Sequence, residues 1–238
     1  MANLLSDTQN FIVPFCRYQS ASIGTSLMPL VGIANIVRNT ILAAPFTWRF
    51  NRNAVNLTGP VVQGTQDYAQ TIADFGFLEV ATANDGTKSY QMSDVKNNAA
   101  LASSNTQARP QIIAVQTDAG SGVLSFRLSG VPDAAYTVNM VYQKAPVQFA
   151  VLSDPWAPIP DSFSDVYNNM CLGYYMDSCQ DPRAPQYIMR GVAGLLARSQ
   201  GLTHMDKMVF AASYMQFGAS QLLEVLKTQQ GQQAQQAK

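Results

Sequence analysis

The sequence is poor in charged residues. Only 13% of its 238 residues are charged, and 15 basic side chains are balanced by 15 acidic ones. Globular domains usually carry about 25% charged residues, and a monomeric soluble domain needs a charged surface. The deficit indicates a surface that faces other protein, with a weakly charged soluble domain as the alternative. Zero net charge also argues against a tight nucleic-acid binder, which needs a basic surface.

Cysteine and histidine are scarce. The three cysteines, Cys16, Cys171 and Cys179, include no CxxC pair. On one shared helix, Cys171 and Cys179 would stand about 12 Å apart, too far for a disulfide. We predict three small buried hydrophobic residues in a reducing compartment. The single histidine, His204, excludes a histidine-rich metal site, and we interpret it as solvated or hydrogen-bonded beside a helix start.

Long apolar runs and catalytic motifs are also missing. The stretch "LMPLVGIANIV" is too short and too interrupted to span a bilayer, and the start has no basic signal region. The motifs GxSxG, GxxxxGK, GxGxxG and HExxH do not occur. Turn, cap and surface roles explain the acidic groups Asp67 with Asp74 and Glu79, and Asp161 with Asp165. We therefore predict no membrane segment, no enzyme, no catalytic or metal-binding residue and no cofactor.

The first and last parts of the chain show helical patterns. Ser6 to Gln9 fits a capping box, and the apolar residues of 30–41 recur at helical spacing until Pro45. After the proline-rich stretch "DPWAPIPD", in which Trp156 is predicted to anchor the corner between sheet and helices, three more helices are predicted. Their starts are Asp161, Asp181 with Pro182, and Thr203.

The middle of the chain shows strand and turn patterns. Asn84-Asp85-Gly86 separates two alternating runs and predicts a hairpin, because positive φ angles are cheap at these residues. "AYTVNMVYQK" predicts a strand with Tyr136, Val138, Met140 and Tyr142 on one face. "PFTWRFNRN" interleaves aromatic residues with Arg49 and Arg52. It fits a strand with one buried aromatic face, or alternatively a platform for single-stranded nucleic acid.

These patterns predict an α+β fold. A helical domain is expected from residues 1–45 and 155–228, with an inserted antiparallel β-sandwich or barrel-like domain at 46–154. Residues 229–238 form a glutamine-rich tail that is expected to be flexible until it docks onto a partner.

The last predicted helix carries a heptad-like series. Apolar residues follow one another at alternating steps of three and four, a pattern of helix packing within the chain or against a neighbouring subunit. The series is Met205, Met208, Ala212, Met215, Ala219, Leu222 and Leu226.

Several stretches together resemble the head-to-tail adaptor proteins of tailed bacteriophages, the tail tubular or connector type. They are "ASIGTSLMPLVGIANIVRNTILAAPFTWRFNRN", "QDYAQTIADFGFLEV", "RPQIIAVQ" and the passage from "YTVNMVYQKAP" through "PIPD" to "DPRAPQY". The resemblance implies a structural virion protein, assembled in the cytoplasm of the host bacterium. It would form a ring, typically a dodecamer, between the portal protein and the tail nozzle protein, with tail fibres as a further partner. Double-stranded DNA would pass through without sequence-specific binding.

This resemblance and the heptad-like series give candidate interface residues and leave alternatives open. The interface candidates are Met205, Met208, Met215, Leu222, Leu226 and Trp156. A tail terminator or nozzle subunit is an alternative of the same class. A carbohydrate-binding β module, with Trp48 and Trp156 as stacking surfaces, and a hydrolase with scattered carboxylates are alternatives of other classes.

Overall fold

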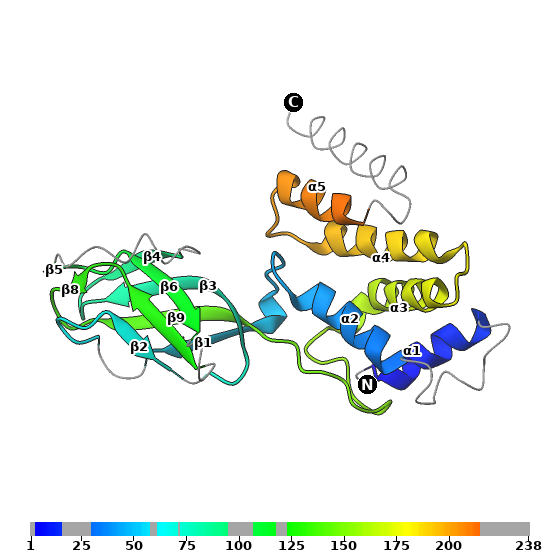
Figure 1. Ribbon diagram of the computed structural model, residues 1–238, viewed down its shortest axis with the longest axis horizontal. Coiled ribbons are helices and arrows are strands. Elements are labelled where there is room, and N and C mark those ends of the chain that lie inside the picture. Colours follow the sequence, from blue (N-terminus) through cyan, green and yellow to red (C-terminus); the bar gives the residue numbers. More distant parts are fainter. Residues whose placement is uncertain are drawn as a thin grey trace. The chain divides into compact units, whose positions relative to one another are not determined.

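The computed structural model describes residues 3–15, 30–57, 61–70, 72–94, 107–117 and 123–214. The fold contains helices and sheet, as the α+β prediction states, and divides into two compact units (Figure 1). One unit comprises Met1–Phe50 and Pro146–Lys238 and holds the helices; the other comprises Asn51–Ala145 and holds the strands. We call them the helical unit and the β unit.

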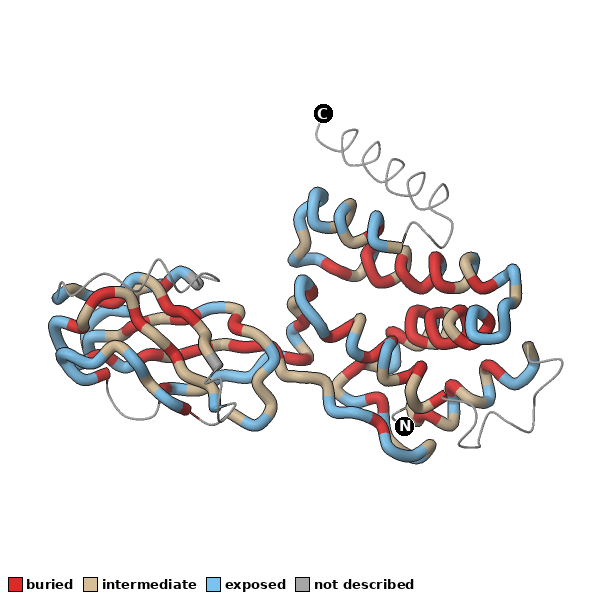
Figure 2. Tube along the Cα trace, in the orientation of Figure 1, coloured by how far each residue is buried: buried red, intermediate tan, exposed pale blue. Residues whose placement is uncertain are grey.

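Five α-helices are present in the described part of the helical unit. They are α1 (Leu5–Ile12), α2 (Leu30–Leu42), α3 (Ser164–Ser178), α4 (Ala184–Arg198) and α5 (His204–Ser213). Short 3-10 turns lie at Val13–Phe15, Arg49–Asn51 and Asp161–Phe163. Buried residues run along α3 and α4 (Figure 2), which pack against each other, and α2 packs on α3. The predicted stripe on α2 is confirmed, because Leu30, Ile33, Ala34, Val37 and Ile41 are all buried.

The helix starts follow the prediction only in part. Thr203 caps α5 as predicted: its hydroxyl accepts from the Asp206 N–H at 3.2 Å. The prediction at Ser6 is wrong, since α1 begins at Leu5 and the Asp7 carboxylate accepts from the Leu4 N–H at 2.7 Å. Asp161 does not cap α3 either, because its Oδ1 accepts from the distant Asn3 N–H at 3.0 Å. Tertiary contacts thus redirect a side chain that is locally suited to a cap.

The predicted start at Asp181 with Pro182 is displaced, because α4 begins at Ala184, directly after Arg183 and with Pro185 in its first turn. The Asp181 carboxylate accepts from the backbone N–H of Arg183 at 2.9 Å and from its guanidinium at 2.7 Å. These bonds stabilise the ionised carboxylate and lower the pKa of Asp181 to about 2.

Nine strands lie in the described part of the β unit. They are β1 (Arg52–Asn56), β2 (Asp67–Ala69), β3 (Phe75–Asn84), β4 (Ser89–Asp94), β5 (Gln107–Ala108), β6 (Ile112–Thr117), β7 (Leu124–Leu128), β8 (Val131–Pro132) and β9 (Thr137–Lys144). Seven form a sheet of order β1-β9-β3-β4-β6-β7-β2, and β5 pairs with β8. The predicted hairpin is confirmed: β3 pairs with β4 from Asn84 opposite Ser89, around Gly86 at φ +92°.

The sheet is mixed and not wholly antiparallel as predicted. β4 and β6 pair in parallel, with Ser93 opposite Ile112, and β5 pairs with β8 in parallel. Parallel neighbours need a connection of about a dozen residues or more, and residues 95–111 between β4 and β6 are sufficient. The other pairings of the seven-stranded sheet are antiparallel.

The sheet curls around its own apolar core. The predicted inner face of β9 is confirmed by the burial of Tyr136, Val138, Met140 and Tyr142. At the two ends of the strand order, the Gln70 amide just beyond β2 donates to the Asn56 carbonyl of β1 at 3.1 Å. A side chain therefore links the two edges where no strand pairing is formed.

Candidate interaction surface

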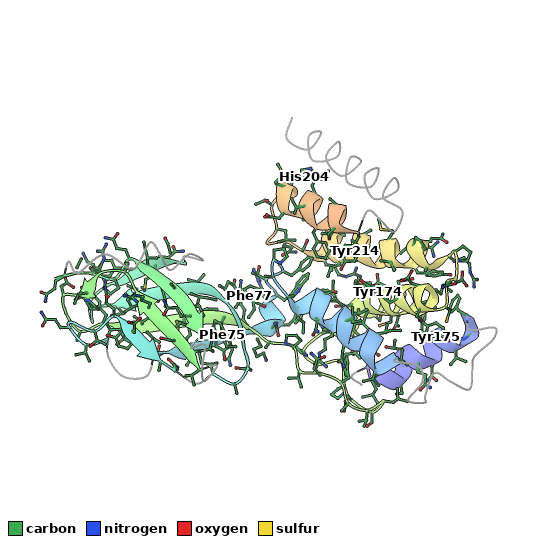
Figure 3. All side chains as sticks on the ribbon, viewed as in Figure 1. Phe75, Phe77, Tyr174, Tyr175, His204 and Tyr214 are labelled. Atoms are coloured by element: carbon green, nitrogen blue, oxygen red, sulfur yellow. The ribbon has the colours of Figure 1, made fainter. Side chains whose placement is uncertain are left out.

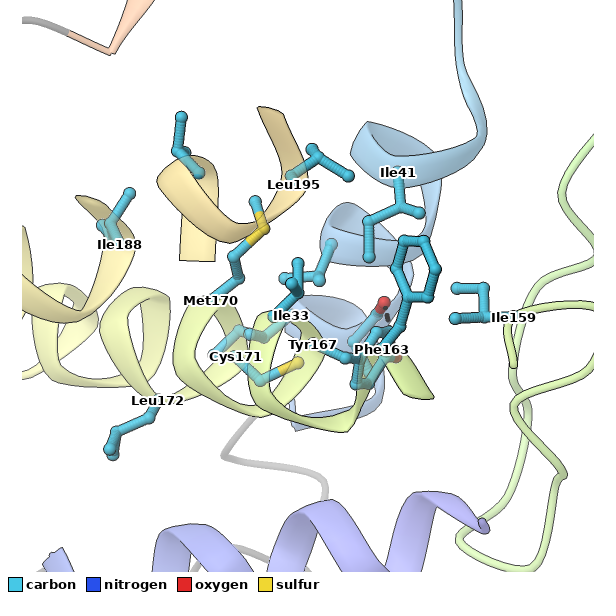
Figure 4. Close-up of a cluster of buried hydrophobic side chains, with 14 of the residues drawn as sticks. Ile33, Ile41, Ile159, Phe163, Tyr167, Met170, Cys171, Leu172, Ile188 and Leu195 are labelled. Atoms are coloured by element: carbon cyan, nitrogen blue, oxygen red, sulfur yellow. Dashed lines mark hydrogen bonds between the residues drawn. The ribbon is translucent and has the colours of Figure 1, made fainter. Parts of the chain in front are cut away.

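Trp156 anchors the proline-rich segment inside the helical unit. Its ring is 1% exposed and lies 4.6 Å from the ring of Tyr167, whose hydroxyl donates to the Ala34 carbonyl at 3.0 Å. Tyr167 lies among the buried side chains of α2, α3 and α4 (Figure 4). Trp156 was predicted to lie at a corner between sheet and helices and at an interface; its side chain is in the core of the helical unit.

A buried arginine holds the same segment against α2. Arg38 is 4% exposed; its guanidinium donates to the Ala157 carbonyl and lies 4.3 Å from the Phe149 ring centre. Burial lowers the pKa of Arg38, opposed by the nearby Tyr167 and Asp154. One helical turn before Arg38, the Asn35 amide accepts from the Phe149 N–H at 2.7 Å and donates to its carbonyl at 3.1 Å. The segment therefore has one fixed path over α2.

Two glycines bring α3 and α4 into close contact. A Cβ at Gly173 would lie 2.6 Å from the backbone nitrogen of Ile188, and one at Gly191 would lie 2.2 Å from the Met170 side chain. Only glycine permits this approach of the two helices.

Cys171 on α3 is fully buried, so burial raises the pKa of its thiol. Cys179 is exposed, contrary to the prediction, because α3 ends at Ser178.

The last described helix, α5, is covered on one side only. Ala211 is its one buried residue, with Met208 and Phe210 partly buried against the core. Phe210 meets Phe46 at 4.8 Å in an edge-to-face contact, and Tyr214 just after α5 hydrogen-bonds with Tyr174 of α3 (Figure 3). These contacts fix the inner side of α5.

The other side of α5 exposes apolar side chains. Met205 is 71% exposed and Val209 is 65% exposed, and Ala212 on the same helical face is also exposed. We define these three residues as the outer face of α5. Their spacing of four and three places them in one stripe. Val209 was missed by the sequence prediction because Met208 fitted the heptad-like series, although a step of four from Met205 would have found it.

The predicted interface residues therefore divide into three groups. Met205 is exposed, Met208 is half-buried, and Trp156 is in the core. Met215, Leu222 and Leu226 lie outside the described residues. The series was predicted to run along one helix, but α5 ends at Ser213, where the Tyr214 N–H turns back to the Ala211 carbonyl at 3.0 Å.

The carboxylates considered for catalysis have separate partners. Asp67 pairs with Arg127 at 3.8 Å, Asp74 accepts from the Tyr142 hydroxyl at 2.7 Å, and Glu79 pairs with Arg52. Asp165 pairs with Arg198 at 2.9 Å, and His204 is exposed at the start of α5. Among the described residues, no three His, Cys, Asp or Glu side chains form a metal-binding group.

The aromatic residues considered for ligand stacking are also occupied. Phe46, Trp48 and Phe50 form a stacked row with centroids 5.6 Å apart at each step, and the Trp48 indole donates to the Ile41 carbonyl at 2.6 Å. They belong to the core of the helical unit, so the prediction of a strand in "PFTWRFNRN" holds only from Arg52 onward. Trp48 and Trp156 are both buried and offer no ring face to a sugar or a base.

In the described part of the chain, no helix combines the length and the apolar character required to cross a bilayer. Among the described residues, the most exposed large apolar side chains lie on helices and their connections.

One comparison with known protein families matches most of the chain. The family model described as "SU10 adaptor protein" matches residues 42–235, which is most of the chain and includes the β unit, α3, α4 and α5. A chain from a solved structure described as "Neck of empty GTA particle computed with C6 symmetry" is 10% identical. That match covers 73% of this chain and 77% of the other, but its TM-score of 0.25 is too low to support an argument. No curated protein matches the sequence.

The predicted resemblance to phage head-to-tail adaptors is confirmed by the family match. The chain belongs to the SU10 adaptor protein family and is a structural head-to-tail adaptor protein of the virion.

Proposed function

We propose that copies of this chain form a ring that joins the portal of the capsid to the tail. The observation that carries the proposal is the outer face of α5, where Met205 and Val209 are the most exposed large apolar side chains of their helix. An adaptor must make contacts with other virion proteins, and apolar faces of this kind favour protein partners. The helical unit, built from both ends of the chain, would provide the ring and portal contacts.

The ring requires two different surfaces on each copy. In a closed ring each subunit offers one surface to the next copy and a second to the previous one. We propose a dodecamer, with Met205, Met208, Met215, Leu222 and Leu226 contributing to one of the two surfaces. The barrel-like β unit would face the tail nozzle and the tail fibres.

The charge balance suits a channel for DNA. Tight binding to phosphates requires an excess of basic side chains, which this chain lacks because its formal net charge is zero. Two of its arginines on the helical unit, Arg183 and Arg198, are paired with carboxylates. The genome would therefore pass through without being held, and the protein would act by shape and not as an enzyme.

Electron microscopy of the full-length protein mixed with its own portal tests this proposal. We expect twelvefold particles bound to one face of the portal. Sixfold rings that bind only tail components would instead identify a tail terminator, and a chain that stays solitary with every candidate partner would contradict the ring.

Leu222→Asp tests the interface residues in the same assay. We expect it to reduce ring formation at least tenfold while the circular dichroism of the β unit stays unchanged, because a buried charge without a partner is costly. Gln221→Asp introduces the same charge at the neighbouring polar position and should form rings normally. Normal rings with Leu222→Asp would remove this residue from the interface.

Deleting residues 229–238 tests the tail. We expect an unchanged melting temperature and weaker capture by immobilised portal, since the glutamine-rich segment would order only on its partner. Equal capture of the full and shortened chains would rule out a contribution of the tail.

A further inference from the structure

We propose that the Asp85–Gly86 dipeptide is a site of spontaneous isoaspartate formation, and that the turn of the β3–β4 hairpin keeps it unreacted in the folded chain. The dipeptide Asp-Gly occurs once in the sequence, and both residues are exposed in the structure. The proposal concerns the chemical lifetime of the β unit and does not depend on the proposed ring.

The reaction joins two neighbouring groups of the chain and needs only water as a further reactant. The Gly86 backbone nitrogen attacks the Cγ atom of the protonated Asp85 carboxyl group. A C–N bond forms, the bond between Cγ and its hydroxyl breaks, and the hydroxyl leaves as water with the amide proton. Water then opens the five-membered succinimide at the former main-chain carbonyl, which gives isoaspartate. Glycine favours the first step because it has no Cβ to hinder the approach.

The turn binds the Asp85 carboxylate through donors other than the Gly86 nitrogen. Its Oδ1 accepts from the backbone N–H groups of Lys88 and Thr87, both at 2.8 Å, and from the Thr87 hydroxyl at 2.9 Å. Its Oδ2 accepts from the Tyr90 hydroxyl at 3.0 Å. The bonds from Lys88 and Thr87 stabilise the ionised carboxylate and lower the pKa of Asp85. Because the attack requires the protonated carboxyl group, the turn keeps Asp85 in its unreactive form.

The turn also fixes the Gly86 nitrogen. Gly86 has a φ of +92°, and its N–H donates to the Asn84 Oδ1 at 2.6 Å. The Asn84 Nδ2 in turn donates to the Ser89 hydroxyl at 2.9 Å, and these two residues form the last pair of β3 with β4. The peptide plane of Gly86 is therefore tied to the ends of both strands. Rotation of this plane toward the Asp85 carboxyl group breaks these bonds.

Tyr90 connects the turn to a more distant part of the β unit. Its ring lies 4.1 Å from the guanidinium carbon of Arg109, which directly follows β5. The contact holds the ring whose hydroxyl donates to Asp85. The protection therefore depends on the folded β unit and not on the turn residues alone.

Isoaspartate at this position would disrupt the sheet. It lengthens the main chain by one carbon atom within a tight turn, so the pairing of Asn84 with Ser89 cannot be kept unchanged. The β4 strand also pairs with β6, so a displaced β4 weakens two strand pairings. An assembled virion makes no new protein, and a turn that slows this reaction preserves the β unit for as long as the particle persists.

Incubation of the full-length protein at neutral pH, below its melting temperature, tests the proposal. Peptide mapping separates the isoaspartate form of the peptide that contains residue 85, and an isoaspartate methyltransferase labels it. We expect the folded chain to react at least about tenfold more slowly than the same chain unfolded in urea, because the reaction requires local opening. Asp85→Glu should abolish the signal, since its ring would have six members.

Asn84→Ala with Tyr90→Phe removes one hydrogen bond from each reacting group and keeps the Tyr90 ring under Arg109. We expect this folded variant to form isoaspartate about fivefold faster than the natural chain, because the weakened turn opens more often. Lys88→Ala is the matched control. It changes an exposed side chain of the same turn and keeps the backbone N–H that Asp85 binds, so its rate should be unchanged.

Thr87→Val removes only the hydroxyl donor and provides a second variant if circular dichroism shows that the double variant is unfolded. It should react faster than the natural chain and more slowly than the chain in urea. Equal rates in the folded and the unfolded natural chain would overturn the proposal. A folded double variant that reacts no faster than Lys88→Ala would overturn it as well.

Discussion

The helical unit and the β unit differ in what they leave exposed. The helical unit has the larger apolar core among the described residues, yet it also exposes Met205, Val147 and Val209 by 65% or more. Among the described residues of the β unit, the most exposed large apolar one is Val62 at 56%. The helical unit therefore has apolar surface left for partners, and the β unit is closer to being complete by itself.

Hydrogen bonds and an ion pair stabilise the β unit around the edge of its apolar core. Glu79 accepts from the Arg52 guanidinium and, at 2.8 Å, from the fully buried Gln143 amide. The Tyr142 hydroxyl donates to Asp74 and accepts from the Asn53 amide at 3.0 Å. One unit is therefore held by close helix contacts, and the other by a shell of paired polar groups around a smaller core.

The largest expected effect comes from separating α3 and α4. Gly173→Ala places a methyl group against the Ile188 backbone, which is rigid, so we expect a loss of about 3 kcal/mol in the stability of the helical unit. Urea unfolding followed by helical circular dichroism measures this. Gly194→Ala is the matched control, because its Cβ first meets the side-chain ends of Val166 and Arg198. Equal stability of the two variants would show that the glycine contact does not hold the helices.

A smaller effect is expected from the polar shell of the β unit. Glu79→Gln replaces the carboxylate that accepts hydrogen bonds from Arg52 and Gln143. We expect a loss of about 1–2 kcal/mol in stability, because buried Gln143 loses a charged acceptor. Arg52→Gln removes the exposed partner and should cost about 1 kcal/mol or less. Urea unfolding of both variants checks the order, and the reverse order would assign the stabilisation to the surface ion pair.

The smallest expected effect is a change in the stability of the β unit that appears only at high pH. Burial, together with the Asp74 carboxylate, raises the pKa of Tyr142 from 10.0 to about 12. Above pH 10 the unfolded tyrosine ionises while the folded one stays protonated. The stabilisation is therefore complete below pH 10 and is lost as the pH rises through 12.

Tyr142→Phe should make the stability of the β unit less dependent on pH between 10 and 12, as measured by urea unfolding at several pH values. Tyr68 and Tyr136 also have raised pKa values, so part of the dependence remains. An unchanged slope in the variant would show that Tyr142 is not the group that titrates.

Local patterns predicted most elements. The stripe on α2, the Asn84-Asp85-Gly86 hairpin, the inner face of β9 and the Thr203 cap depend on neighbours within a few residues, and each is confirmed. The partner of Asp161 is 158 residues away in sequence, and the parallel pairing of β4 with β6 joins strands that are separated by a long connection. Local sequence cannot identify such partners, because they depend on which elements meet in the folded chain.

The candidate interaction surface could also be predicted from the sequence only in part. The sequence determined that the chain is poor in charged residues and carries an apolar series near its end, and its family follows from the sequence alone. Only the tertiary structure decided which apolar residues are available. It buried Trp156 beside Tyr167, turned Met208 toward the core and left Met205 and Val209 exposed. The physical reason is that helical spacing defines the faces of a helix, but only the neighbouring elements determine which face is covered.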